Sequence, residues 1–155
     1  MRKTILRILL SFMLISAISF SAVSVPVYAA TKAEKKEEAK QKKAAEKTYK
    51  YYKKTFKNTA DLKWKVQKKK TGKTYTFTLT SWTKKYTAST IHRWANNNDP
   101  GYLKTLDTFE NICKVQYKNA KYYGLKKPTV ILIWKSADNI TIVKAKNGYL
   151  IDDDE

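Results

Sequence analysis

Cysteine, histidine, glycine and proline are all scarce in this sequence. Its 155 residues include one cysteine, one histidine, four glycines and three prolines. A single cysteine forms no disulfide within the chain, so an apolar core must hold the fold together. No glycine-rich phosphate loop, nucleophile elbow or paired-cysteine metal motif is present. The sequence therefore predicts no bound metal and no cofactor.

Acidic residues and arginine are rare beside lysine. Lysine and arginine together number 32 against 13 acids, a formal net charge of +19, and the arginines are Arg2, Arg7 and Arg93 alone. Lysine lacks the planar fork with which arginine reads guanine edges or clamps a phosphate at two points. This composition favours diffuse attraction to a polyanion over sequence-specific reading of nucleic acid.

Residues 1–29 have the pattern of a signal peptide. A basic start precedes the apolar run ILLSFMLISAISFSAVSV, and Val27-Tyr28-Ala29 fits a cleavage site. The competing interpretation is a membrane anchor, but serines interrupt the run, and no later stretch is apolar enough to span a bilayer. No cysteine lies near the cleavage site, so lipid attachment there is not expected. We therefore expect a secreted protein, extracellular or associated with the cell envelope, with no transmembrane segment in the mature chain.

Residues 30–58 are predicted to form a Lys/Ala/Glu-rich helix or spacer. Ala, Glu and Lys favour helix, and Ala45, Tyr49, Tyr52 and Phe56 follow one another along a single helical stripe. Such a stripe is more often packing than recognition, so the amphipathic-helix interpretation is favoured over a dedicated aromatic binding face. Tyr51 lies off the stripe. Whether this helix docks on the rest of the chain stays open.

Residues 59–155 are predicted to form a small α+β domain. Apolar residues alternate along 61–82, which indicates a β-hairpin turning at the lysine-rich KKTG. Residues 82–98 indicate only a short helical or irregular crossing. Asp99 and Pro100 then begin the main helix, and Gly124 with Leu125 ends it. The expected inward face of that helix comprises Leu103, Leu106, Phe109, Cys113, Tyr117 and Ala120.

The last part of the chain indicates a second hairpin and a short final strand. The dense run from Val130 to Trp134 is typical of a strand covered on both faces, and Asp138-Asn139 and Asn147-Gly148 are turn signals. The predicted fold is an antiparallel sheet of two hairpins with the main helix as the crossing between them. The Lys-rich amino-terminal helix precedes this sheet, and if it docks, we expect it to lie against the main helix.

The order of elements over residues 74–152 resembles that of small secreted proteins of Gram-positive bacteria. The resemblance is carried by the threonine-rich strand, the helix and the ending DNITIVKAKNGYLID, whose turn motifs are common ones. It implies a compartment and a topology, and no reaction.

Two enzymatic interpretations are possible, and neither is favoured. A hydrolase using His92 and Cys113 would need both side chains in contact within a cleft, but Cys113 falls on the apolar stripe, where cysteine behaves as a small hydrophobe. A nuclease centred on IHRWANNND would have one histidine and one nearby acid, too few for most metal-dependent hydrolysis. The acidic ending DDDE lacks the spaced ligands of a calcium loop. The sequence therefore predicts a protein that is not an enzyme.

The leading hypothesis is association with an anionic surface or polymer, such as cell-wall polymer, anionic lipid head groups or extracellular nucleic acid. Each lysine–anion contact would release a counterion and make the affinity salt-dependent. A solubilising role for the lysines is the plain alternative. The candidate contacts lie on the first helix and at the hairpin turn: Lys50, Lys53, Lys54, Lys57, Lys68, Lys69, Lys70 and Lys73.

A second hypothesis is a protein-binding module, such as an inhibitor, an immunity factor or a docking domain. Trp82, Arg93 and Trp94 would then be exposed anchors, because tryptophan and arginine dominate binding hot spots. Oligomeric state is not predicted by the sequence.

Overall fold

A computed structural model describes residues 31–151. The predicted signal peptide and the acidic ending at 152–155 lie outside these residues. Residues 32–151 belong to one compact unit. Its elements in chain order are α2 (Lys32–Thr55), β1 (Leu62–Thr71), β2 (Thr74–Thr83), α3 (Ala88–Asn96), α4 (Pro100–Tyr122), β3 (Thr129–Lys135), β4 (Thr141–Lys146) and β5 (Tyr149–Ile151).

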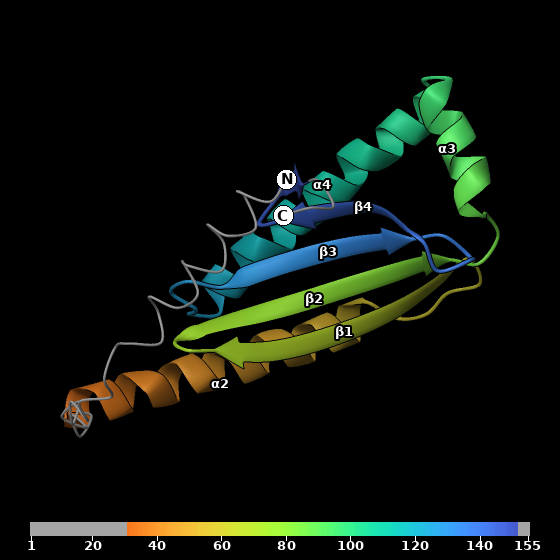
Figure 1. Ribbon diagram of the computed structural model, residues 1–155. Coiled ribbons are helices and arrows are strands. Elements are labelled where there is room, and N and C mark those ends of the chain that lie inside the picture. The colour runs from red at the N-terminus through yellow and green to blue at the C-terminus, as the bar shows by residue number, and fades with distance from the viewer. Residues whose placement is uncertain (1–30, 152–155) are drawn as a thin grey trace, which may run out of the picture. The chain divides into compact units, whose positions relative to one another are not determined.

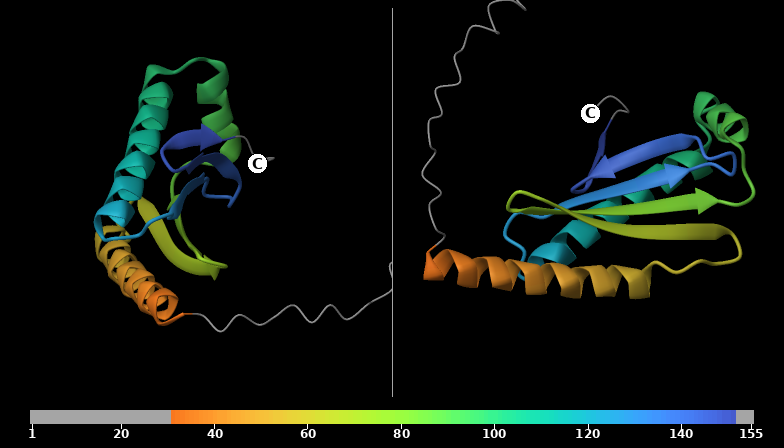
Figure 2. Two further views of the ribbon diagram at one scale, coloured as in Figure 1. Left: turned by 90° about the vertical axis from the view of Figure 1, so that its left-hand side faces the viewer. Right: turned by 60° about the horizontal axis from the view of Figure 1, so that its bottom comes forward.

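The fold is α+β, as predicted, with two layers. Helices α2 and α4 lie on one face of a five-stranded sheet, and the short helix α3 lies at one end of it (Figure 1; Figure 2). The opposite face of the sheet carries no described helix (Figure 2, left). Each strand of this sheet therefore has one face toward the helices and one face toward solvent.

The strands follow the order β1-β2-β3-β4-β5, and both predicted hairpins are present. The prediction of a wholly antiparallel sheet is wrong, because β2 and β3 are parallel. The physical reason lies in the connection. A helical crossover from β2 through α4 carries the chain back along the sheet, so the next adjacent strand starts at the same end as β2.

The predicted stripe on the first helix is confirmed as packing. Ala45 and Tyr52 are fully buried, while Tyr49 and Phe56 are partly buried against the core. Tyr52 contacts Phe77 of β2 edge-on, with ring centroids 5.4 Å apart, and its hydroxyl donates a 2.5 Å hydrogen bond to the carbonyl of Gln116 on α4. Helix α2 is thus fastened to both the sheet and α4, which answers the question that the sequence left open.

Helix α4 begins as predicted, but its inward face differs from the prediction. Asp99 caps it by accepting a 3.0 Å hydrogen bond from the Tyr102 amide. Phe109, Cys113 and Ala120 are buried, and Gln116 is buried with them. Leu103, expected inside, is 47% exposed. The N-terminal part of α4 contributes Tyr102 and Thr105 to a groove instead of closing on the sheet, so an apolar residue there is not required.

The expectation that the run Val130–Trp134 is covered on both faces is also wrong. Val130 and Leu132 are fully buried under α4, whereas Ile131 and Ile133 are only partly buried on the face without helices. Isoleucine suits these two positions because β-branched side chains pack well on a half-buried pleated surface.

Glycine is required at position 148, in the predicted Asn147-Gly148 turn. Its φ is +96°, and an added Cβ would lie 2.8 Å from the Cα of Lys114 on α4. We expect Gly148→Ala to lower the free energy of unfolding by about 1–3 kcal/mol. Gly72→Ala, at a positive φ with open space around the site, is the matched control and should cost only about 1 kcal/mol. Chemical denaturation measures both, and an equal loss in the two variants would contradict the close packing of this turn on α4.

Candidate functional site

We call the sheet surface that lacks described helices the open face. Strand pairing identifies its members, because residues that pair directly across a sheet share a face and successive residues alternate. One row across it joins Lys65, Thr80, Ile133 and Lys144, and the row beyond joins Lys63, Trp82 and Lys135. Threonines of β2 and isoleucines of β3 therefore form a central strip, with lysines of β1 on one side and lysines of β4 on the other.

The open face carries six lysines and no acidic residue among the residues that the structure describes. Its width from the β1 lysines to the β4 lysines is three strand spacings, roughly 14 Å. Lys65 and Lys69 of β1 and Lys146 of β4 are exposed. The sheet holds the six like charges apart, and these three exposed side chains are accessible to a ligand. The lysines are Lys63, Lys65, Lys69, Lys135, Lys144 and Lys146.

Acidic residues of α2 and of the turn before β1 neutralise lysines that point elsewhere. Lys68 and Lys70 lie on the side of β1 that faces α2, where their ammonium groups contact the carboxylates of Glu46 and Glu38. These contacts lower the pKa values of both glutamates, mainly by hydrogen bonding to their charged forms. Two further pairs are Lys85–Asp61, which joins the two ends of the first hairpin, and Lys126–Glu37, which joins the loop after α4 to α2. These four ion pairs all lie away from the open face, so the acids that form them do not neutralise its lysines.

The lysines predicted as polyanion contacts do not gather on one surface. Lys68 and Lys70 fasten the hairpin to α2, while Lys69 belongs to the open face. The others are exposed along or just after α2 and at the hairpin turn: Lys50, Lys53, Lys54, Lys57 and Lys73.

Five of the six open-face lysines are missing from the predicted contacts. Three of these five, Lys135, Lys144 and Lys146, come from β3 and β4, whose pairing with the first hairpin no local pattern reveals. Lys63 and Lys65 lie on β1, and the alternation of apolar residues with lysine along that strand is the signal that could have found them.

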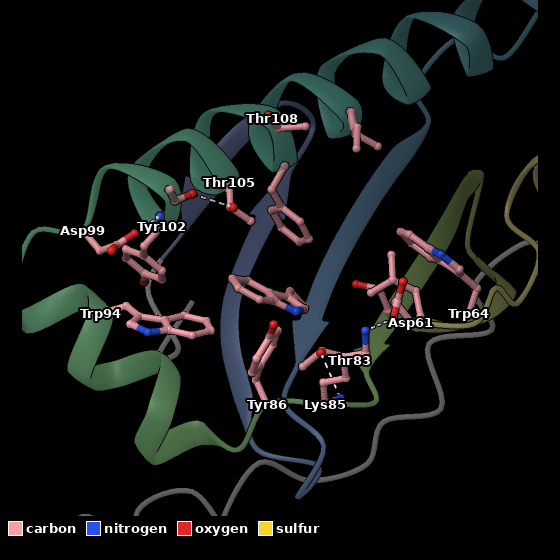
Figure 3. Close-up of a pocket in the computed structure, with 16 residues that line it drawn as sticks. Asp61, Trp64, Thr83, Lys85, Tyr86, Trp94, Asp99, Tyr102, Thr105 and Thr108 are labelled. Atoms are coloured by element: carbon pink, nitrogen blue, oxygen red, sulfur yellow. Dashed lines mark hydrogen bonds and ion pairs between the residues drawn. The ribbon is translucent and has the colours of Figure 1, made fainter.

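A second feature lies on the opposite side of the sheet, between it and the N-terminal half of α4. This aromatic groove has a volume of about 770 Å³. Trp94 and Tyr102 lie at one end of it, and Trp64 and Asp61 lie at the other (Figure 3). Three of the four tryptophans in the chain line it. Its aromatic members are Trp64, Tyr86, Trp94, Tyr102, Phe109 and Trp134.

A small residue between two large ones explains why the groove exists. Trp64 of β1, Ser81 of β2 and Trp134 of β3 pair in one row across the sheet. The next inward-facing row replaces the serine with Leu79, which is fully buried. The serine hydroxyl donates a 3.3 Å hydrogen bond to the carbonyl of Ile133 instead of filling the space. The core therefore closes at Leu79 and opens into the groove at Ser81.

Ring contacts and an ion pair fix the walls of the groove. Tyr86 and Trp94 meet edge-on with centroids 4.8 Å apart, and the centroids of Tyr102 and Trp134 lie 6.5 Å apart. At the rim, the Lys85 ammonium lies 2.7 Å from the Asp61 carboxylate, and its hydrogen bond lowers the pKa of that carboxyl group. The groove is thus aromatic at its walls and polar at its rim.

The predicted partner anchors are divided between the two features. Trp82 lies on the open face, where Lys63 Nζ is 5.7 Å from its ring centroid and its indole donates a 2.8 Å hydrogen bond to Asn139. Trp94 lines the aromatic groove, and Arg93 is exposed on α3. Both tryptophans are half-buried. The structure does not give these three side chains one common surface.

His92 and Cys113 are not brought together in a cleft. His92 is exposed on α3, whereas Cys113 is fully buried and its thiol sulfur lies 3.7 Å from the carbonyl oxygen of Val130. Burial raises the pKa of the Cys113 thiol, so the thiol stays protonated at neutral pH. A protonated, inaccessible thiol is a poor nucleophile.

Thiol labelling of the native protein should therefore be slow. We expect Cys113 to react with an aromatic disulfide reagent at least about 100-fold more slowly in the folded chain than in denaturant, because reaction requires unfolding. Absorbance of the released thiolate follows the reaction. Stoichiometric labelling of the folded chain within the mixing time would contradict this burial.

Comparisons with family models, with curated proteins and with solved structures found no match to this chain. Within residues 31–151, no helix is long and apolar enough to cross a membrane. Over the same residues, His, Cys, Asp and Glu side chains form no group of three that could hold a metal ion.

Proposed function

We propose that this protein is an exported, non-enzymatic domain that binds polyanions through the open face of its sheet. The observation that carries the proposal is the composition of the open face: six lysines from three strands share one face that has no acidic residue among the described residues. The phosphate-bearing polymers and surfaces outside a cell are the ligands with matching chemistry. Cell-wall polymer, anionic lipid head groups and extracellular nucleic acid all present closely spaced anions.

The central strip gives such a ligand a place to lie. Its threonines donate and accept hydrogen bonds, and Thr76 and Thr78 are partly exposed between the two groups of lysines. Lysine side chains are long enough to lean inward from both sides toward a chain placed along β2. The contacts would be mobile and numerous, which favours repeating anions over one phosphate held in a fixed geometry.

The arrangement of the helices supports the same proposal. Helix α2 buries its aromatic stripe and pairs its glutamates with Lys68 and Lys70, so it supports the sheet from behind. Its own exposed lysines, Lys50 and Lys54 among them, raise the overall field without facing the strip. They would speed encounter with a polyanion more than they would strengthen the final contact.

The experiment that tests this function is binding of the chain from Ala30 onward across a salt series. Three probes are used in parallel: purified phosphate-containing wall polymer, vesicles with anionic phosphoglycerol head groups, and single-stranded DNA. We expect at least one of them to bind with an affinity that falls steeply as salt rises, because each lysine contact releases a counterion. Absence of binding to all three at low ionic strength would overturn the proposal. The three arms also separate a polymer ligand from a lipid surface.

A further inference from the structure

The aromatic groove differs in chemistry from the open face and calls for a different ligand. Only three of its lining residues carry charge: Asp61, Lys85 and Asp99. Two of these are acids, in a chain whose net charge is +19. A polyanion gains nothing from entering such a site, since the carboxylates repel it and Lys85 is already paired with Asp61.

The lining also differs from that of a cavity for an acyl chain. Leu62 and Ile112 are the only aliphatic hydrophobic residues that line it, whereas six aromatic residues do so. Aromatic faces carry negative charge density and attract the weakly positive C–H groups of a ligand laid flat against them. Sugar rings present such C–H groups on their faces and hydroxyls on their edges.

The polar groups of the groove suit those hydroxyls. Thr105 and Thr108 donate their own hydroxyl hydrogens to helix carbonyls at 2.7 and 2.8 Å, which leaves their oxygen lone pairs as acceptors. The Asp99 carboxylate caps α4 through one oxygen, Oδ1. Tyr86, at 43% exposure, brings a phenol that can donate as well as accept. A ligand that both donates and accepts hydrogen bonds at its edges fits this set, and a purely apolar ligand does not.

We propose that the aromatic groove binds a neutral oligosaccharide, with sugar rings stacked on Trp94 at one end and on Trp64 at the other. The walls are already assembled, because ring contacts to Tyr86 and Phe56 hold these two indoles in place. Binding would therefore order few side chains. Sugar binding in the groove does not depend on the polyanion function, since the groove and the open face lie on opposite sides of the sheet.

The test is tryptophan fluorescence and calorimetry of the chain from Ala30 onward with three neutral tetrasaccharides. These are β-1,4-linked N-acetylglucosamine, β-1,4-linked glucose and α-1,4-linked glucose. We expect saturable binding of at least one, weakened about tenfold by Trp94→Ala, because a stacked ring is lost. Tyr86→Ala should weaken binding as well. Both side chains lie outside the buried core cluster, so these variants should retain the fold, which circular dichroism verifies.

Trp82→Ala is the matched control, because this tryptophan lies on the open face and should leave sugar affinity unchanged. Tetramethylammonium chloride is titrated in parallel, since aromatic rings beside acids also attract organic cations. Saturation by the cation with no response to any sugar would overturn the proposal in favour of a cationic ligand. No response to any of the sugars, or equal weakening by Trp82→Ala and Trp94→Ala, would overturn it too.

Discussion

Replacing Tyr52 by alanine should lower the free energy of unfolding by about 3–5 kcal/mol, the largest effect that we expect of any single substitution in this chain. The ring is fully buried at the junction of α2, α4 and the sheet, where it contacts Phe77 and Phe56. Alanine would leave a cavity at this junction. It would also remove the hydroxyl that bonds to the Gln116 carbonyl.

Tyr52→Phe separates the two contributions. It keeps the ring and removes only the hydrogen bond, so it should cost about 1 kcal/mol. Urea denaturation followed by circular dichroism measures both variants. Tyr49→Ala is the neighbouring control on the same helix and should cost less than Tyr52→Ala, because Tyr49 is only partly buried. A loss below about 1 kcal/mol for Tyr52→Ala would mean that α2 does not dock as described.

The second large effect concerns the open face. Changing Lys65, Lys69 and Lys146 together to glutamine should weaken binding to the best polyanion probe by about 100-fold at low salt, at roughly 1 kcal/mol for each lysine. All three side chains are exposed, so the fold should be unaffected. The dependence of log affinity on log salt should become shallower by about two for single-stranded DNA, as three fewer counterions are released.

A variant of the first helix and the residues just after it provides the control for net charge. Lys50, Lys54 and Lys57 are also exposed, and changing them to glutamine removes the same number of charges from the helix layer. We expect only a small loss of affinity in this helix variant. The two variants reduce the long-range electrostatic field by the same amount, but only the open-face variant also loses close contacts with the polyanion. Equal losses in the two variants would mean that binding depends on net charge alone and that the open face has no special role.

Local patterns in the sequence predict the helices and strands well, and the reasons are physical. The helical stripe through Tyr52, the alternation around Phe77 and the Asp99 cap each depend on neighbours within a few residues. Such signals need no knowledge of tertiary contacts. The turns at Asn139 and Asn147 can also be predicted from the sequence, since both residues adopt the positive φ that asparagine tolerates.

The wrong predictions concern places where distant segments meet. The parallel pairing of Thr78 with Ile131 follows from the route of the α4 crossover, which no local pattern encodes. Leu103 is exposed while its neighbour Tyr102 lines the groove, and the groove depends on Ser81 lying between two tryptophans of other strands. The register between strands determines these features, and short-range sequence patterns do not predict that register.

In the candidate sites, too, local patterns predict some features, and contacts between distant segments determine the others. Alternation along β1 separates Lys69 from Lys68 and Lys70, but only the placement of α2 shows that the last two are paired with glutamates. The sequence shows that this run of lysines is positively charged. It does not show which of them are paired with α2 and which lie on the open face. Trp82 and Trp94 are close in sequence, although β2 and α3 direct them to opposite sides of the sheet.

Amide chemical-shift mapping tests binding at the open face most directly. The isotope-labelled chain is titrated with the polyanion probe that binds best. We expect the largest shifts on outward-facing residues of β1, β2 and β4, with Lys65, Thr78 and Lys146 among them, and we expect high salt to reverse them. Shifts concentrated on α2, or spread evenly over all exposed lysines, would contradict binding at the open face.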